Sequence, residues 1–348
     1  MAVITIVGSG MMGSALAFPA RENGHEVRLV GTHLDREIIS ACLKENRHPK
    51  FKKDFPDGVK FYQIEELQTA LSGADLVIGG VSSFGVDWFA EKVLPAIAEN
   101  TPVLTVTKGL FDTADGRLLT YPDIWNTRLS ELGRKLPLNA VGGPCTSYEL
   151  VAHDQTEVTF CGSDINILER IRGYLATDYY HISITTDVTG IESAVALKNG
   201  YALGIALTIG LNRKSFGNDT LHFNSQAAVF GQAVKEMYRL LKFQNALSLN
   251  NLCVGAGDLY VTVYGGRTRL VGILLGEGKN IDEAKEALNG VTLESLVVAE
   301  RVARAVKMNI KKGVLDGADF PLLLHIDEII TQKAAVLIPW EKFTYKEV

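Results

Sequence analysis

The sequence predicts an α/β fold in two parts, a doubly wound parallel sheet over residues 1–187 and an all-α domain over residues 188–348. Three observations support this. A β-branched run at residues 3–7 leads into a glycine-rich turn. Short apolar runs then alternate with helical stretches, and from about residue 189 the pattern is helical almost throughout. Apolar strands separated by helices are typical of a parallel sheet that is covered on both faces.

The glycine-rich turn at residues 8–13 reads Gly-Ser-Gly-Met-Met-Gly and has the context of a dinucleotide-binding site. It follows a strand and opens a helix, and a strand at 25–30 closes a βαβ unit of about 30 residues. Gly8 allows the tight turn, Gly10 removes a Cβ where a pyrophosphate approaches, and Gly13 lets the helix pack close to the strand. The helix directs its N–H groups at the phosphates. We therefore predict a Rossmann-type domain, the alternative being a glycine turn without a ligand.

The remaining elements follow from apolar runs and their punctuation. Strands are expected at 75–81, 102–107, 139–144, 158–161 and 180–184, with a helix over 86–99. Helices are expected over roughly 190–211, 224–243, 281–288 and 294–307, with glycine-rich breaks at 255–257 and 265–266. The apolar run at 195–211 is too short and too polar to span a membrane, so we expect a buried helix. The cleft between the two domains is the expected active site.

Composition excludes several classes of partner. The chain has 348 residues, is 47% apolar and 22% charged, and carries a net charge of −5. Without a basic tract, we expect neither nucleic acid nor an anionic membrane surface as a partner. The four cysteines have neither metal-ligand nor CxxC spacing, which indicates reduced thiols in a cytoplasmic protein and no metal site. The chain opens directly on a strand, so we expect no signal peptide.

Two polar residues in apolar or glycine-rich surroundings are candidates for acid–base chemistry. Lys198 interrupts an apolar helix, where an ammonium is costly unless it is paired. Asn199 beside it can bond a substrate oxygen or cap local backbone. Asp258 follows a glycine-rich stretch and is a candidate to orient the lysine. The alternatives are a surface lysine on an amphipathic helix and an aspartate that caps the following segment.

Two further basic residues are candidate anion ligands. Arg267 follows a glycine pair, so exposed backbone N–H groups would accompany a guanidinium that can bind a phosphate or carboxylate in bidentate fashion. Lys108 directly follows a strand and so lies at the carboxyl edge of the sheet, where ligands bind. A solvated basic turn and a surface-loop lysine are the respective alternatives.

These motifs, in this order, resemble the NAD-dependent glycerol-3-phosphate dehydrogenase family over most of the chain. They are Gly8-Ser-Gly-Met-Met-Gly13, Thr107-Lys-Gly109, Gly143-Pro144, Ala196-Leu-Lys-Asn199, Gly257-Asp-Leu259 and Tyr264-Gly-Gly-Arg267. The Leu-Lys-Asn and Asp-Leu-x-x-Thr-x-Tyr-Gly-Gly-Arg strings are the specific ones. The resemblance implies hydride transfer between NAD(P)H and dihydroxyacetone phosphate, which yields sn-glycerol 3-phosphate.

The resemblance also implies roles for individual residues. Lys198 corresponds to the catalytic lysine that protonates the ketone oxygen, Lys108, Asp258 and Thr262 to its active-site partners, and Arg267 to the phosphate-binding arginine. The expected cofactor-binding residues are Gly8, Ser9, Gly10, Met11, Met12, Gly13, Thr32, His33, Ser82, Lys108, Arg267 and Glu294. The expected substrate-binding residues are Lys108, Gly143, Cys145, Lys198, Asn199, Asp258, Thr262, Arg267 and Thr268. A homodimer is expected.

Three departures from the family pattern concern substrate recognition. Thr268 stands where the family usually has asparagine, residues 145–148 read Cys-Thr-Ser-Tyr, and the loop at 212–218 differs from the usual glycine-rich stretch. One alternative is therefore a dehydrogenase of the same architecture acting on another small anionic hydroxy or keto compound. The other is a non-catalytic dinucleotide-sensing module, which would not need Lys198.

The residues after the second strand bear on cofactor choice. No carboxylate stands directly at the end of that strand, because Asp35 comes two residues later than an acidic ribose ligand is expected. Thr32 and His33 can bond a hydroxyl or a phosphate, and Arg36 can pair with a phosphate. We therefore expect NAD and NADP to be discriminated only weakly. The alternative for Asp35 and Arg36 is that they simply start the next helix.

Overall fold

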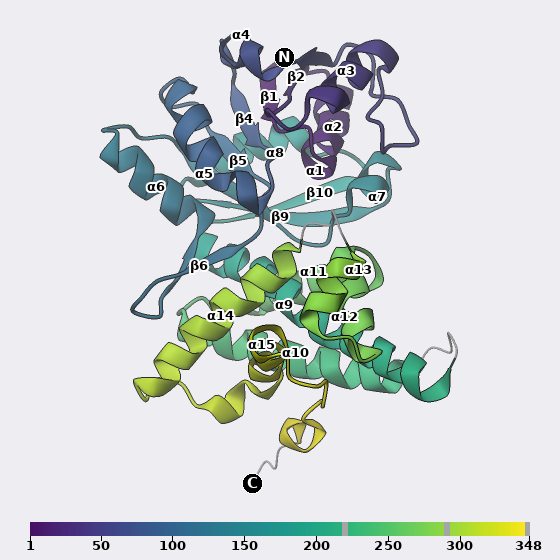
Figure 1. Cartoon of the computed structure of the whole chain (residues 1–348). Coiled ribbons are helices and arrows are strands. Elements are labelled where there is room, and N and C mark those ends of the chain that lie inside the picture. Colours follow the sequence, from purple (N-terminus) through teal and green to yellow (C-terminus); the bar gives the residue numbers. More distant parts are fainter. Residues whose placement is uncertain (218–221, 289–292, 345–348) are drawn as a thin grey trace. The chain divides into compact units, whose positions relative to one another are not determined.

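The computed structural model describes residues 1–217, 222–288 and 293–344, and the chain in it forms two compact units (Figure 1). The first unit comprises residues 1–108 and 121–192, and the second comprises 109–120 and 193–348. The chain passes from one unit to the other within helix α9 (Val188–Phe216), a few residues beyond the change of pattern at 187. The segment 109–120 groups with the helical unit, although it lies within the first half of the sequence.

The first unit is built on an eight-stranded sheet with the order β10-β9-β8-β5-β4-β1-β2-β3. The strands are β1 (Val3–Val7), β2 (Glu26–Val30), β3 (Lys60–Tyr62), β4 (Leu76–Gly79), β5 (Val103–Thr105), β8 (Leu138–Gly142), β9 (Thr156–Gly162) and β10 (Tyr180–Thr185). The predicted fold class is confirmed. The three-residue strand β3 escaped prediction because it is too short to form an alternating pattern.

One strand pair corrects the expectation of an entirely parallel sheet. All neighbours pair in parallel except β8 and β9, which are antiparallel. Between these strands lies only the five-residue helix α7 (Ser147–Val151). Such a helix rises about 8 Å, which is much less than the roughly 17 Å of a five-residue strand. The chain therefore turns back instead of returning to the far edge of the sheet.

Helices of the first unit pack against the buried strands. They are α1 (Met11–Ala15), α2 (Ala17–Glu22), α3 (Arg36–Glu45), α4 (Leu67–Leu71), α5 (Val86–Trp88), α6 (Tyr121–Glu131) and α8 (Ile165–Leu175). The helix expected over 86–99 is divided, because α5 continues as a π-helical turn (Phe89–Val93) and a 3₁₀ turn (Leu94–Ala96). Strand β1 and helix α2 contribute to a layered core, in which Ile4, Ile6 and Phe18 are fully buried.

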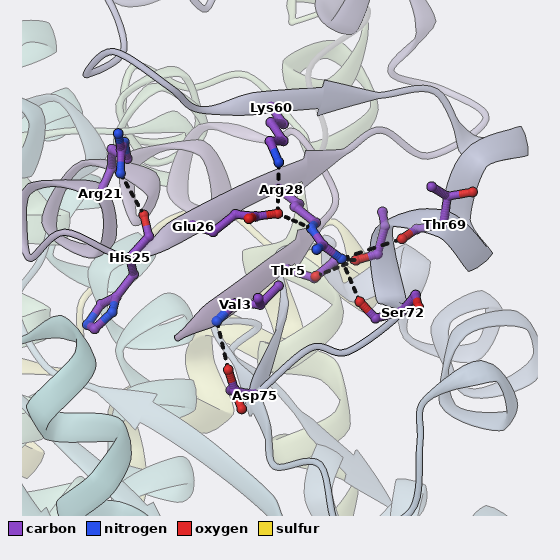
Figure 2. Close-up of polar contacts among 11 residues, drawn as sticks. Val3, Thr5, Arg21, His25, Glu26, Arg28, Lys60, Thr69, Ser72 and Asp75 are labelled. Carbon is purple, nitrogen blue, oxygen red and sulfur yellow. Dashed lines mark hydrogen bonds and ion pairs between the residues drawn. The ribbon is translucent and has the colours of Figure 1, made fainter. Parts of the chain in front are cut away.

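Polar contacts hold the strands next to β1 in place (Figure 2). Arg28 in β2 donates to carbonyl groups at the carboxyl end of α4, and it also pairs with Glu26 at 2.8 Å. Glu26 in turn accepts from Lys60 in β3 at 3.0 Å. At the amino end of β1, the N–H of Val3 donates to Asp75 at 2.8 Å. These contacts fix the strand that leads into the glycine turn.

Where the structure describes it, the second unit consists of helices and one hairpin. The helices are α9, α10 (Phe223–Phe243), α11 (Leu249–Tyr264), α12 (Arg267–Gly276), α13 (Ile281–Ala287), α14 (Glu294–Lys311) and α15 (Pro321–Gln332). The expected break at 265–266 is confirmed, whereas the one at 255–257 is wrong, since those residues lie inside α11. Strands β6 (Leu110–Asp112) and β7 (Leu118–Thr120) form the hairpin. The Arg304 guanidinium of α14 donates two hydrogen bonds, of 2.8 and 2.9 Å, to the two carboxylate oxygens of Asp112.

Helix α9 forms the centre of the second unit. With 29 residues it is long and apolar enough to cross a membrane, so its exclusion on length was wrong, but 83% of its most apolar window is buried, as expected for a core helix. Glycines let α12 approach its backbone closely. A Cβ on Gly272 would lie 2.4 Å from Ala206 Cβ, and one on Gly276 would lie 2.2 Å from the Leu207 carbonyl oxygen.

We predict that Gly272→Ala lowers the free energy of unfolding by about 1–3 kcal/mol, because the added methyl group overpacks the contact of α12 with α9. The matched control is Gly231→Ala in α10, where a Cβ meets no atom within 4 Å. That variant should gain up to about 1 kcal/mol from helix propensity. Urea denaturation followed by circular dichroism measures both, and an equal gain in the two variants would contradict the close packing.

Candidate active site

The three glycines of the turn differ in how closely other atoms surround them. Gly8 has a φ of +107°, and a Cβ there would lie 2.7 Å from the Gly80 carbonyl at the end of β4. A Cβ on Gly13 would lie 2.6 Å from the Gly8 carbonyl oxygen. At Gly10 the nearest atom is 3.5 Å away, which is an ordinary contact. The protein therefore leaves room at Gly10, as a backbone that must admit a dinucleotide pyrophosphate requires.

The residues around this turn also fit a bound nucleotide. Helix α1 begins at Met11 with Gly10 as its N-cap, so Met11, Met12 and Gly13 form its first turn. The Ser9 side chain is fully buried, and its hydroxyl has no hydrogen-bond partner in the part of the chain that the structure describes. An unpaired buried hydroxyl costs about 1–3 kcal/mol, so it is a position where a ligand or water would be stabilising.

The loop after β2 places the predicted cofactor residues beside each other. Thr32 is buried, and its N–H and hydroxyl each donate to the Asp35 carboxylate at 2.8 Å. The ring of His33 lies 5.9 Å from that of Trp88. Asp35 is the N-cap residue of α3, and Arg36, its first residue, pairs with Glu65 at the surface. Asp35 and Arg36 therefore start the next helix, which confirms the alternative interpretation of these two residues.

The ends of β4 and β5 carry two further predicted residues. The Thr107 hydroxyl donates to the Val81 carbonyl at 2.6 Å and so ties the two strand ends together. Ser82 follows as the N-cap of a short 3₁₀ turn. Lys108 follows β5, and its ammonium donates to the Gly143 carbonyl at 3.1 Å. The lysine thus stands at the carboxyl edge of the sheet, as predicted.

A small cavity in the first unit brings several predicted residues together. Met12 of the glycine turn lines it together with Lys108, Gly143 and Cys145, which were predicted from distant parts of the sequence. Leu16, Val106, Val141, Val158 and Tyr180 complete the lining. The lining is thus apolar apart from one ammonium group.

Sequence reasoning missed Glu192. This residue is fully buried, and neither carboxyl oxygen has a hydrogen-bond partner among the described residues. Burial raises the pKa of Glu192 to about 8, while the Lys108 ammonium opposes that shift and Asp123 adds to it. The carboxyl is therefore mostly protonated at neutral pH. An acidic residue in an apolar run was the same signal that identified Lys198, and it could have identified Glu192.

In the second unit, Lys198 and Asp258 form a buried ion pair and hydrogen bond between Nζ and Oδ1. Their side chains are 13% and 1% exposed. The surface-lysine and helix-cap alternatives are therefore wrong, because Asp258 lies in the interior of α11. The predicted pairing of the two residues holds across 60 positions of sequence.

Gly255 explains why the two residues meet. A Cβ at this position would lie 2.6 Å from Met237 Cε and 3.0 Å from Ala194 Cβ. Only glycine lets α11 approach α9 there. Residues three or four positions apart share one face of a helix, so Asp258 follows Gly255 on the face that Lys198 shares with Ala194. The glycine-rich stretch thus positions the aspartate by packing, not by breaking the helix.

The other predicted residues of the second unit have different surroundings. Thr262 donates its hydroxyl to the Asp258 carbonyl at 2.7 Å, and Asn199 is half-buried next to Lys198. Arg267 is exposed at the start of α12, directly after Gly266 with its φ of +97°.

Thr268 is buried, and Glu294 is the first residue of α14. In the departing loop, residues 212–216 complete α9, whereas Asn218 lies outside the described residues.

Two family models together match most of the chain. Residues 3–167 match the N-terminus, and 187–338 the C-terminus, of NAD-dependent glycerol-3-phosphate dehydrogenase. The chain belongs to the NAD-dependent glycerol-3-phosphate dehydrogenase family. It is 32% identical to the NADP(+)-dependent glycerol-3-phosphate dehydrogenase of Archaeoglobus fulgidus, over 95% of this chain and 99% of that protein. It is 30% identical to the Myxococcus xanthus glycerol-3-phosphate dehydrogenase [NAD(P)+], over 82% and 84% of the two chains.

A solved structure shares the fold. The glycerol-3-phosphate dehydrogenase of Coxiella burnetii superimposes with a TM-score of 0.78 at 24% identity, over 98% of this chain and 97% of that one. The family models confirm the resemblance found from the motifs. In this glycerol-3-phosphate dehydrogenase family member, the glycine turn shares a cavity with Lys108, and Lys198 is paired with Asp258.

We predict that Glu192→Gln becomes more stabilising, relative to wild type, as the pH rises. A carboxyl whose pKa is raised from 4.5 to about 8 contributes stability fully below 4.5, and that contribution is lost as the pH rises toward and through about 8. Glutamine keeps the neutral form throughout. The relative gain between about pH 5 and pH 9 should exceed about 1.4 kcal/mol, the equivalent of one pKa unit.

Urea denaturation at both pH values measures this effect. Glu99→Gln, at an exposed glutamate of the same unit, serves as the control and should show no comparable change. A pH-independent difference between wild type and Glu192→Gln would show that Glu192 is ionised in the folded protein.

Proposed function

We propose that this chain catalyses reversible hydride transfer between NAD(P)H and dihydroxyacetone phosphate, with sn-glycerol 3-phosphate as the reduced compound. The observation that carries the proposal is the buried Lys198–Asp258 pair within a member of this family. A charged pair removed from water is costly to maintain, and proton transfer to a developing alkoxide gives it a purpose. The nicotinamide, when bound, supplies the hydride.

The first unit has the features needed to hold the cofactor. We infer that the turn from Gly8 to Gly13 takes the pyrophosphate, since Gly10 is free of packing constraints and the Ser9 hydroxyl lacks a partner among the described residues. Thr32 and His33 follow β2, Ser82 follows β4, and these two strands flank β1, so the three residues are inferred to contact the rest of the nucleotide. Met12 and Lys108, which line one cavity, are inferred to lie near the nicotinamide and the anionic substrate.

Lys198 is the proposed proton donor. Its ammonium gives a proton to the ketone oxygen in reduction, and the neutral amine accepts the hydroxyl proton in oxidation. The Asp258 carboxylate orients the amine and stabilises the charged form between turnovers. Because the Lys198 side chain keeps 13% of its surface exposed, protons can be exchanged with solvent.

Substrate binding is assigned to basic and small polar groups. Arg267 is exposed and none of the ion pairs found among the described residues includes it, so its donors remain available for a phosphate. Thr268, Asn199 and Thr262 are proposed to bond substrate oxygens, together with Lys108, Gly143 and Cys145 of the first unit. Arg267 and Glu294 are also proposed to contact the cofactor.

A second candidate function keeps the reaction and changes the substrate. Thr268 and Cys145 depart from the family pattern at positions assigned to the substrate, which favours another small anionic hydroxy or keto compound if either departure alters the anion site. A dinucleotide-sensing module without catalysis has no use for the buried pair.

The test follows oxidation of NADH and NADPH with dihydroxyacetone phosphate, dihydroxyacetone and a branched 2-keto acid. The phosphorylated ketone should have by far the highest kcat/KM. Arg267→Ala should raise its KM about 10- to 100-fold, because a charge-assisted bond contributes about 1.5–3 kcal/mol. Unphosphorylated dihydroxyacetone should be affected far less.

Arg239→Ala is the matched control, since it removes an exposed arginine of the same unit that pairs with Asp319. It should leave both KM values unchanged. Equal losses for the two ketones in Arg267→Ala would remove the arginine from phosphate binding. A preference for the 2-keto acid would select the second candidate function.

We also propose that the protein is a cytoplasmic homodimer. All four cysteines are free thiols, in keeping with a reducing compartment. Leu249, Tyr260 and Leu270 of α11 and α12 are 78%, 58% and 47% exposed, and a partner subunit would cover such apolar side chains. Sedimentation equilibrium should give twice the 37.9 kDa of one chain, and a single-chain mass would contradict the dimer.

A further inference from the structure

The peptide groups of Ser9, in the middle of the glycine turn, are held by two side chains. The Ser9 N–H donates to Asp35 Oδ2 at 3.3 Å, and the Ser9 carbonyl lies 3.1 Å from His48 Nε2. Asp35 stands at the start of α3, and His48 lies just beyond its end. Residues at and just beyond the two ends of α3 therefore hydrogen-bond to the backbone of Ser9, which lies between Gly8 and Gly10.

The role of His48 follows from its second nitrogen. His48 Nδ1 accepts from the Lys50 N–H at 3.1 Å, so the proton is on Nε2, which donates to the Ser9 carbonyl. Only 1% of His48 is exposed, and burial lowers its pKa, so the neutral ring persists at neutral pH. The ring also packs against Phe51, with their centroids 4.7 Å apart. The imidazole is thus a fixed donor to the turn.

One oxygen of the Asp35 carboxylate, Oδ2, is directed at the protein itself. Oδ2 accepts from the N–H and the hydroxyl of Thr32, each at 2.8 Å, and from the Ser9 N–H. An acidic residue that selects NAD instead presents its oxygens to the ribose hydroxyls and repels a 2′-phosphate. Asp35 Oδ2, which connects the loop after β2 to the glycine turn, therefore accepts three hydrogen bonds from the protein before any nucleotide binds.

We propose that Asp35 and His48 are positioning residues that hold the glycine turn open for a dinucleotide, and that Asp35 supports NADH and NADPH equally instead of selecting NADH. The inference rests on the proposed dinucleotide-binding function. It assigns to Asp35 a contribution to the affinity for both cofactors and no contribution to the preference between them.

The opposite end of β1 supplies matched controls. There an aspartate and a histidine also hold the backbone. The Val3 N–H donates to Asp75 at 2.8 Å, and the Ala2 N–H donates to His25 Nδ1 at 3.1 Å (Figure 2 shows Val3, Asp75 and His25). Substitutions there also remove side-chain hydrogen bonds to backbone groups at or next to β1, but at the end remote from the glycine turn.

The experiment measures the dissociation constants of NADH and NADPH by fluorescence titration, together with thermal midpoints. Asp35→Ala and His48→Ala should each weaken both cofactors about 3- to 10-fold, the equivalent of one hydrogen bond. The NADH-to-NADPH ratio should stay within about 2-fold of wild type. Asp35→Asn should restore most of the affinity, because its amide oxygen accepts from the same donors. Asp75→Ala and His25→Ala should leave both constants unchanged.

Several outcomes would overturn the proposal. If Asp35→Ala or Asp35→Asn weakens NADH while strengthening NADPH, Asp35 reads the ribose. If Asp75→Ala weakens both cofactors as much as Asp35→Ala, the effect is general stability. Unchanged affinities in both turn variants would also overturn it. Should Asp35→Ala not fold, Asp35→Asn and His48→Ala decide the matter. Wild-type protein that binds neither nucleotide would overturn the proposed function itself, and this inference with it.

Discussion

The buried ion pair between Lys198 and Asp258 is the interaction on which the second unit depends. Two charges withdrawn from water are tolerated only when their geometry is good, and loss of either partner leaves an uncompensated charge. Helices α9 and α11 must therefore be held close together. Gly255 provides that approach against Ala194, while Gly272 brings α12 onto the other part of α9. Gly255 thus serves the packing next to the pair, and Gly272 serves the packing of α12 against α9.

The first unit follows a different principle, in which strand ends converge at one edge. Parallel pairing of β1, β4 and β5 brings the glycine turn, Ser82 and Lys108 to the same end of the sheet. Lys108 is anchored to the Gly143 carbonyl after β8, while Glu192 approaches it as a neutral acid. Because burial keeps Glu192 mostly protonated at neutral pH, this residue adds little negative charge next to the lysine.

Much of this arrangement could be predicted from local patterns. The glycine turn is a contiguous motif in a βαβ context, and Lys198 is conspicuous because it interrupts an apolar run. The β8–β9 reversal depends on the length of an intervening helix, and the hairpin at 110–120 joins the second unit only through tertiary contacts such as Asp112 with Arg304. Gly255 was mistaken for a breaker because sequence does not show which glycines face a neighbouring helix. The hydrogen bonds of Asp35 with Thr32 and Ser9 could not be predicted from residue spacing either.

The most direct test of the account is a double-mutant cycle on the ion pair, read as kcat for reduction of dihydroxyacetone phosphate. Lys198→Met should lower kcat by about 10²–10⁴-fold, as loss of a general acid does. If the aspartate acts through the lysine, Lys198→Met/Asp258→Asn should be no more than about 3-fold slower than Lys198→Met alone, because residues that act as a unit are not additive. Losses that multiply, or a Lys198→Met enzyme that keeps more than about a tenth of its kcat, would contradict the account.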